Sequence, residues 1–325
     1  MSLSSQQIYP LNIHMDVPVS RETRKTELSR MWMSTTTSSD ILVSMPYPLI
    51  SAQDLAGQLE DGDLRIVDTR WYLADPAEGR AEYRRHHIPG AIFLDLESDL
   101  CAPEGPGRHP LPDADLLTGL LGSVGIGNHH RLVVYDDSAG SVAARMWWMV
   151  RHLGHEEAQV LDGGYSAWWK AGLPTTARVP SWPAETYVGH GRTDDLVTRQ
   201  ELAAMLGSVI LLDARAPERY AGHEDPVDPV AGHIPTAISA PYAENTATNG
   251  RFLTSNELRK RFQGLGVGGE QPVITYCGSG VTACSNVLAA VVAGLPAPLL
   301  YPGSWSDWCT TPGMPITTGP NPGEV

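Results

Sequence analysis

The feature that most constrains the fold of this chain is an internal duplication. Four motifs of the first half return in the same order in the second half, at an offset of about 140 to 146 residues. Repetition over such a distance predicts a copied domain rather than a short solenoid repeat. The matching pairs are "LRIVDTRW" (64–71) with "VILLDARA" (209–216), "AEYRRHHIPGAI" (81–92) with "AGHIPTAI" (231–238), "LVVYDDSAGSVAAR" (132–145) with "PVITYCGSGVTAC" (272–284), and "LDGGYSAW" (161–168) with "LYPGSWSDW" (300–308).

Each copy alternates apolar runs with helical patterns. The runs "RIVD", "LVVY", "VILLD" and "PVITY" predict buried strands, and longer segments such as "SVAARMWWMVRHLG" predict helices between them. Ser51 and Thr198 precede two of these helices and are expected N-caps, with Asp54 and Glu201 three residues later. The fold class is therefore α/β, with a mostly parallel sheet flanked by helices in each of two tandem domains.

The domain boundaries follow from the repeat and from composition. Residues 1–45 are rich in Ser and Thr without periodicity, and we expect a poorly ordered extension. The first domain covers 46–178 and the second covers 193–325. The segment 179–192 between them belongs to a stretch rich in Pro and Thr (174–192) and is the expected linker.

Charge and cysteine content limit the possible partners. The 325 residues carry a formal net charge of -14, which disfavours nucleic acid and anionic membrane surfaces. We see no apolar stretch long enough to cross a membrane. Four cysteines without a C-x-x-C pair predict reduced thiols, and therefore a cytoplasmic protein.

Cys277 is the strongest candidate for a reactive group. It follows the predicted strand "PVITY" and precedes a helix that begins near Thr282, and ligands of α/β sheets bind at such strand ends. Gly278 and Gly280 allow backbone conformations in which successive N–H groups point to one place. Together with the positive end of the helix dipole, this loop favours a thiolate or a bound anion.

The duplicate of this loop carries a different group. "DDSAGSV" places Asp136 opposite Cys277, and a carboxylate cannot replace a thiol as a nucleophile toward sulfur. We therefore expect one catalytic domain and one domain that has lost its site. Cys101, Cys284 and Cys309 lack the glycine loop, and we expect them to be buried thiols.

Taken together, "HIPGA", "DARAPERY", "CGSGVTAC" and "YPGSWSDW" resemble the two-domain rhodanese-type sulfurtransferases over about residues 46–318. The resemblance implies that Cys277 takes sulfane sulfur from a donor as a persulfide and passes it to cyanide or a thiol, such as thioredoxin. It also implies that the amides of Gly278, Gly280, Val281 and Thr282 surround the persulfide, and that no cofactor is needed.

The loop after the cysteine also suggests the donor. Thiosulfate enzymes of the family typically carry Arg-Lys there, whereas this chain has Gly278 and Ser279, as in 3-mercaptopyruvate sulfurtransferases. A hydroxyl can hydrogen-bond a keto acid, and the missing lysine weakens binding of a dianion. Arg215 and Arg219 match the substrate arginines of the family, and we predict that they bind the donor carboxylate, with an Arg215–Asp213 ion pair as the structural alternative.

A Ser-His-Asp relay is proposed for the mercaptopyruvate enzymes. By resemblance Ser279 supplies the serine and His87 the histidine, while the aspartate has no evident match in "GRAEYRRHH". The repetition of His87 at His233 equally favours a structural role, as an anchor of the turn before Ile-Pro.

Four other functions compete with this one. A thiosulfate enzyme, and a relay of persulfide to a protein acceptor, would use the same cysteine. A non-catalytic scaffold would be expected to lack it. A phosphatase of the C-x5-R type would need arginine where Ala283 stands. The pairs His86/His87 and His129/His130 show neither metal-ligand spacing nor a third ligand, so we predict no metal.

Overall fold

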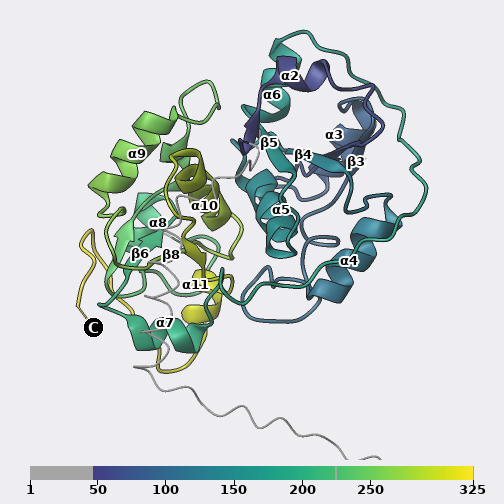
Figure 1. Ribbon diagram of the computed structural model, residues 1–325. Helices are drawn as coiled ribbons and strands as arrows, with labels where there is room; N and C mark the ends of the chain where they lie inside the picture. The colour runs from purple at the N-terminus through teal and green to yellow at the C-terminus, as the bar shows by residue number, and fades with distance from the viewer. Residues whose placement is uncertain (1–46, 224, 325) are drawn as a thin grey trace, which may run out of the picture.

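The computed structural model describes residues 47–223 and 225–324, and the predicted extension 1–45 lies outside them. The chain forms two lobes, each built around its own sheet (Figure 1). The first sheet has the strand order β1-β5-β4-β2-β3 and the second β7-β6-β8-β9, and every pair of neighbours in both is parallel. The predicted α/β fold with two parallel sheets is confirmed.

The first lobe contains β1 (Leu49–Ile50), α2 (Ala52–Ala56), β2 (Leu64–Asp68), α3 (Glu78–Arg85), β3 (Ala91–Phe93), α4 (Ala114–Ser123), β4 (Arg131–Tyr135), α5 (Ser141–His152), β5 (Ala158–Leu161) and α6 (Gly164–Lys170). The second contains α7 (Arg199–Met205), β6 (Ile210–Asp213), α8 (Pro217–Ala221), β7 (Ala237–Ser239), the 3-10 helix η1 (Tyr242–Asn245), α9 (Ser255–Gly264), β8 (Val273–Tyr276), α10 (Ala283–Val292), β9 (Leu299–Leu300) and α11 (Ser304–Trp308). None of the described helices is long and apolar enough to cross a membrane.

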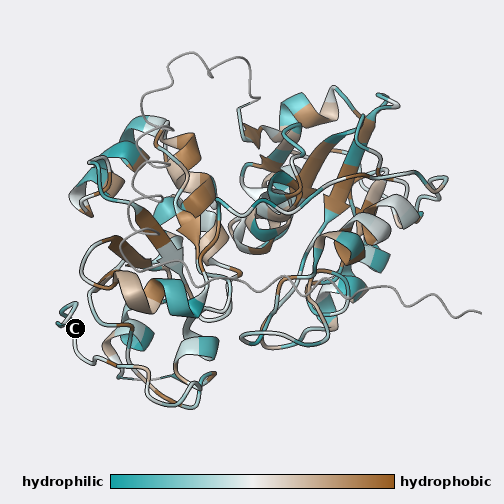
Figure 2. Cartoon of the chain, turned by 60° about the horizontal axis from the view of Figure 1, so that its bottom comes forward, coloured by the Kyte–Doolittle hydropathy of each residue, from teal (hydrophilic) through white to brown (hydrophobic). Residues whose placement is uncertain are grey.

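Local sequence signals account for these elements. The central strands β2, β4, β6 and β8 are made largely of aliphatic residues and are buried, and Figure 2 shows hydrophobic strands inside each lobe. Both predicted N-caps are confirmed, because the side chains of Ser51 and Thr198 accept the amides of Asp54 and Glu201.

The duplication extends to the buried polar contacts. At the end of β2 the Asp68 carboxylate binds the Arg70 guanidinium, with Nη2 2.7 Å from Oδ2, and Arg215 binds Asp213 at the end of β6 with the corresponding distance at 2.6 Å. All four side chains are at most 1% exposed. The free-energy cost of burying such a pair is offset by its ionic contact and by further hydrogen bonds, such as those from Arg70 to His86 O and from Arg215 to Gly232 O. These residues therefore stabilise the strand ends of both domains.

Each lobe covers the strand-end loop of the other. The first lobe contributes "GRH" (107–109), and the Arg108 amide donates to Ser306 Oγ at 2.9 Å. The second contributes the matching "GRF" (250–252), whose Phe252 amide donates to Asp162 Oδ1 at 2.8 Å. The Phe252 ring lies against Gly140, in the loop that carries Asp136. Helices α5 and α10 pack together between the lobes (Figure 1).

A buried guanidinium joins the two lobes. Arg145, on α5, is 0% exposed and donates to Gly280 O in the second lobe at 3.3 Å. It also donates to the carbonyl of His109, in the covering loop, and to the carbonyls of Leu100 and Pro110 beside that loop. One side chain thus fixes the covering loop of the first lobe against the cysteine loop of the second.

We expect Arg145→Met to lower the free energy of unfolding by about 3 kcal/mol, because it leaves buried carbonyls without a donor. Urea denaturation of both proteins measures the change. Arg192→Met is the control, because Arg192 is half exposed and its ion pair with Asp194 contributes less than about 1 kcal/mol. An equal effect of the two substitutions would contradict the role given to Arg145.

Candidate active site

The loop that follows β8 is held in one conformation by α11 and the segment before it. Cys277 is 1% exposed, its amide donates to Ser304 Oγ at 3.1 Å, and its carbonyl accepts the Trp305 amide at 2.9 Å. Gly280 has φ +78°, and a Cβ there would lie 2.3 Å from Pro302 O. Only glycine fits at this position, so the second glycine of the motif is required by the fold.

The amides of the loop are left without partners. Among the described residues, no carbonyl or side chain accepts the N–H of residues 278–282. Val281 and Thr282 lead into α10, where Thr282 is the N-cap residue. A set of unpaired N–H groups beside a thiol and a helix N-terminus is an anion-binding arrangement.

The loop of the first lobe shows the same arrangement with an anion in it. The Asp136 carboxylate is 0% exposed and accepts the amides of Ser138, Gly140, Val142 and Ala143 at 2.8–3.0 Å. Burial raises the pKa of Asp136, and these four hydrogen bonds oppose the rise. The duplicate of the cysteine loop therefore binds a negative group of this chain.

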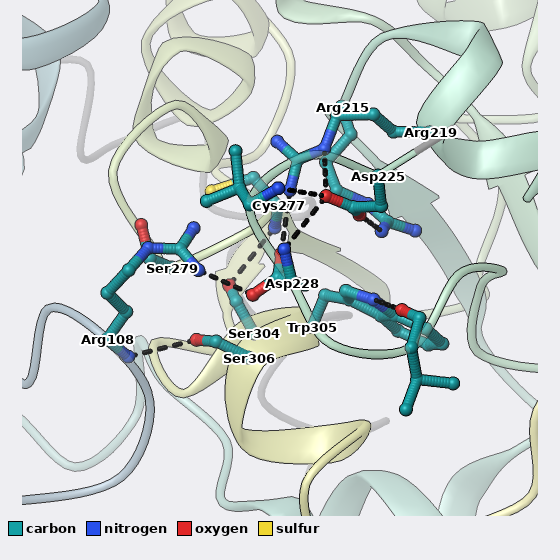
Figure 3. A network of polar contacts seen from close by, with 12 residues as sticks. Arg108, Arg215, Arg219, Asp225, Asp228, Cys277, Ser279, Ser304, Trp305 and Ser306 are labelled. Carbon is teal, nitrogen blue, oxygen red and sulfur yellow. Dashed lines mark hydrogen bonds and ion pairs between the residues drawn. The ribbon is translucent and has the colours of Figure 1, made fainter. Parts of the chain in front are cut away.

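Two arginines approach the cysteine loop from different lobes (Figure 3). A Cβ on Gly278 would lie 3.1 Å from Arg108 Nη2 and 3.2 Å from Arg219 Nη2. Arg219 was predicted at this place from its motif. Arg108 was not, and its only sequence signal is its position in "GRH", the counterpart of "GRF" in the second half.

Arg215 occupies a different environment. Its side chain is 1% exposed, and each nitrogen of its guanidinium contacts Asp213, Asp225 or Gly232 O. The fold therefore shows the Arg215–Asp213 ion pair that was the structural alternative to donor binding. We do not assign Arg215 to the donor carboxylate.

Ser279 is paired with a histidine of the other lobe, but not with the predicted one. His109 Nδ1 lies 2.7 Å from Ser279 Oγ. Burial, followed by the charges of Arg145 and Arg108, lowers the pKa of His109 to about 4. The ring is therefore neutral at pH 7 and can exchange a hydrogen bond with the serine hydroxyl.

His87 does not reach the cysteine loop. Its ring nitrogens lie 2.7 Å from Tyr83 O and 3.1 Å from Arg178 O, and its ring stacks on Tyr83. His233 makes the corresponding contacts to Tyr220 and Asn321 in the second lobe. The repeated histidine anchors a turn in each domain, and the prediction that His87 pairs with Ser279 is corrected to His109.

The remaining cysteines lie outside the amide loop, and the expectation of burial holds for Cys101 and Cys284 but not for Cys309, which is partly exposed. Cys101, Cys284 and Cys309 are free thiols, and desolvation raises the pKa of each, that of Cys309 to about 11. A raised pKa keeps these thiols protonated and therefore weakly nucleophilic.

One group of possible metal ligands lies elsewhere in the described part of the chain. The fold brings Glu185 beside His129 and His130, so the expectation that this pair lacks a third ligand is corrected. His130 Nδ1, however, accepts the Gly127 amide, which leaves the proton of the neutral ring on the other nitrogen. Burial, followed by repulsion from Arg65, lowers the pKa of His130, and Arg65 would also repel a cation. We propose no metal site there.

Cys277, the amide loop and the two arginines define a two-domain α/β protein with one thiol site where the lobes meet. The pattern of the rhodanese-like domain matches the chain twice, at residues 51–171 and 198–311. The chain belongs to the rhodanese-like domain family.

Relatives and solved structures agree with this assignment. The chain is 45% identical to a probable 3-mercaptopyruvate sulfurtransferase of Pseudomonas aeruginosa over 280 residues, which cover 83% of this chain and 98% of the relative. It is 41% identical to a putative thiosulfate sulfurtransferase of Mycobacterium tuberculosis, covering 83% and 97%. The crystal structure of the 3-mercaptopyruvate enzyme SseA of Escherichia coli superposes with a TM-score of 0.72 at 31% identity, covering 80% of this chain and 99% of that one.

The lowered pKa of His109 gives a prediction about stability. As pH falls below 6.5 the unfolded histidine takes up a proton, while the folded one stays neutral until about pH 4, so stability is lost in this window. Between pH 7.5 and pH 5 the titration of His109 should lower the free energy of unfolding by about 2 kcal/mol.

On going from pH 7.5 to pH 5, we therefore expect the free energy of unfolding of His109→Asn to fall by about 2 kcal/mol less than that of the wild type. Urea denaturation at the two pH values measures this difference. The exposed His129 serves as the control, and His129→Asn should follow the wild type. If His109→Asn also follows the wild type, His109 titrates normally in the folded protein and the assignment is wrong.

Proposed function

We propose that this protein is a sulfurtransferase that takes sulfur from 3-mercaptopyruvate onto Cys277 and passes it to a thiophilic acceptor. The observation that carries the proposal is the buried Cys277 beside unpaired amides, with Arg108 and Arg219 next to the loop. The names of the relatives support a sulfurtransferase and include both 3-mercaptopyruvate and thiosulfate as donors.

In the first half-reaction the Cys277 thiolate attacks the sulfur of 3-mercaptopyruvate. A new S–S bond forms, the C–S bond of the donor breaks, and its electron pair leaves on carbon as the enolate of pyruvate. The enolate takes up one proton and becomes pyruvate, while the cysteine becomes a persulfide. The amides of residues 278–282 stabilise the negative terminal sulfur, as the corresponding amides hold Asp136.

Each polar group near the loop has a separate role. Arg108 and Arg219 bind the donor carboxylate, because guanidinium groups pair with carboxylates through two parallel hydrogen bonds. The Ser279 hydroxyl, oriented by neutral His109, hydrogen-bonds the keto group and lies on a route for the proton that pyruvate takes up. No step requires a metal or an organic cofactor.

In the second half-reaction the acceptor attacks the outer sulfur of the persulfide. Cyanide leaves as thiocyanate, and a thiol leaves as its own persulfide, while the S–S bond electrons return to the Cys277 thiolate. A small thiol or thioredoxin would serve as acceptor, and a relay to another protein would use the same step. A cytoplasmic location remains our prediction, resting on the reduced cysteines.

The first test compares sulfur transfer to cyanide from 3-mercaptopyruvate and from thiosulfate. We expect a higher kcat/KM for 3-mercaptopyruvate, with loss of both activities in Cys277→Ser, because serine cannot form a persulfide. Mass spectrometry after incubation with the donor should show one extra sulfur on the wild type only. Faster turnover of thiosulfate would show that thiosulfate, and not 3-mercaptopyruvate, is the preferred donor. No transfer from either compound would favour a non-catalytic scaffold.

The second test concerns the two arginines. We expect Arg108→Met and Arg219→Met each to raise the KM for 3-mercaptopyruvate about tenfold or more, since each removes a charged hydrogen bond of about 1.5 kcal/mol or more. Arg251→Met is the matched control, because Arg251 holds the position of Arg108 against the loop of the other lobe. Equal KM values in all three variants would contradict the assignment.

A further inference from the structure

A buried carboxylate of the protein joins the two arginines of the site. Asp228 places Oδ1 2.5 Å from Arg108 Nη1 and Oδ2 2.7 Å from Arg219 Nη2, and its side chain is 1% exposed (Figure 3). The two arginines belong to different lobes. Asp228 therefore makes one ion pair within its own lobe and one across the interface.

The neighbouring carboxylate, Asp225, has a different set of partners. Its Oδ1 accepts the amides of Val227 and Asp228 and also contacts Arg219 Nε, while Oδ2 reaches Arg215. These contacts hold the turn of the loop. Among the described residues the Asp228 carboxylate has no polar partner other than the two arginines. The described polar contacts of the Asp228 carboxylate are therefore all with the two arginines of the site.

The guanidinium groups retain donors for a ligand. Arg108 uses Nη1 for Asp228, and its Nη2 is the atom that lies 3.1 Å from the Cβ position of Gly278. Arg219 uses Nε and Nη2 for the two acids, and its Nη1 lies 3.4 Å from the same position. Asp228 thus leaves one terminal nitrogen of each arginine facing the cysteine loop.

The charges of this network cancel. Arg108, Arg215 and Arg219 carry three positive charges, and Asp213, Asp225 and Asp228 carry three negative charges. The Cys277 thiolate and the buried Arg145 guanidinium, which donates to Gly280 O, add one charge of each sign. A donor with one negative charge therefore enters a site without net charge, where the free N–H groups stabilise it. A donor with two negative charges meets no excess positive charge and approaches the Asp228 carboxylate, which disfavours it.

We propose that Asp228 is a specificity-determining residue that selects a monoanionic donor over a dianionic one, by neutralising one charge of the Arg108–Arg219 pair and fixing both guanidinium groups. The inference rests on the proposed function and deepens it. It assigns the choice between 3-mercaptopyruvate and thiosulfate to a residue outside the cysteine loop.

The test replaces Asp228 by asparagine, which keeps the size of the side chain and removes its charge. We expect the ratio of kcat/KM for thiosulfate to kcat/KM for 3-mercaptopyruvate to rise about tenfold or more, because the added positive charge acts on two donor charges rather than one. Glu60→Gln is the control for overall charge, because Glu60 is exposed in the first lobe, and it should leave the ratio unchanged.

Binding provides a readout that does not need turnover. In the Cys277→Ser background, Asp228→Asn should lower the dissociation constant of thiosulfate about tenfold more than that of pyruvate, measured by isothermal titration calorimetry. Unchanged ratios, or a parallel loss for both anions, would overturn the proposal and leave Asp228 a purely structural contact. An inactive wild type that still shows the shift in binding would refute the proposed function and retain the inference.

Discussion

The site depends on the buried guanidinium of Arg145. This side chain has no carboxylate partner among the described residues and is stabilised by backbone carbonyls from both lobes. Its bond to Gly280 O fixes the cysteine loop, and its bond to His109 O fixes the covering loop of the first lobe. Arg108 and His109 belong to that covering loop. The bond from Arg145 to His109 O therefore positions both the arginine proposed to bind the donor carboxylate and the histidine that contacts Ser279.

The electrostatics of the site are built from opposing buried charges. The cysteine loop offers hydrogen-bond donors without a net charge of its own, while the arginines beside it are nearly balanced by Asp225 and Asp228. Arg108 and Arg219 are partly exposed, and their like charges repel one another beside the loop. The carboxylates between them offset this repulsion. Asp225 and Asp228 neutralise the arginines. In our proposal the same neutralisation disfavours the binding of a donor with more than one negative charge.

Local signals in the sequence were sufficient for part of this arrangement. The parallel sheets, the N-caps and the loop at Cys277 all arise from residues that are neighbours along the chain. The partner of Ser279 could not be predicted from such signals, because His109 is 170 residues away and reaches the serine only through the packing of the two lobes. The choice of His87 came from the family resemblance, whereas its repetition at His233 favoured the turn-anchoring role that the fold shows. His109 stands where the second copy has Phe252, so the repeat does not mark it.

The exchange of covering loops has a consequence for how such a protein can arise. Because the loop of each lobe completes the strand end of the other, a protein with only one of these domains would leave its own thiol loop uncovered. Pairing with a second copy of itself would cover that loop, with each subunit placing its covering loop against the thiol loop of the other. With both copies in one chain, the two halves can differ, as Phe252 differs from His109 and Asp136 from Cys277, while one site is kept.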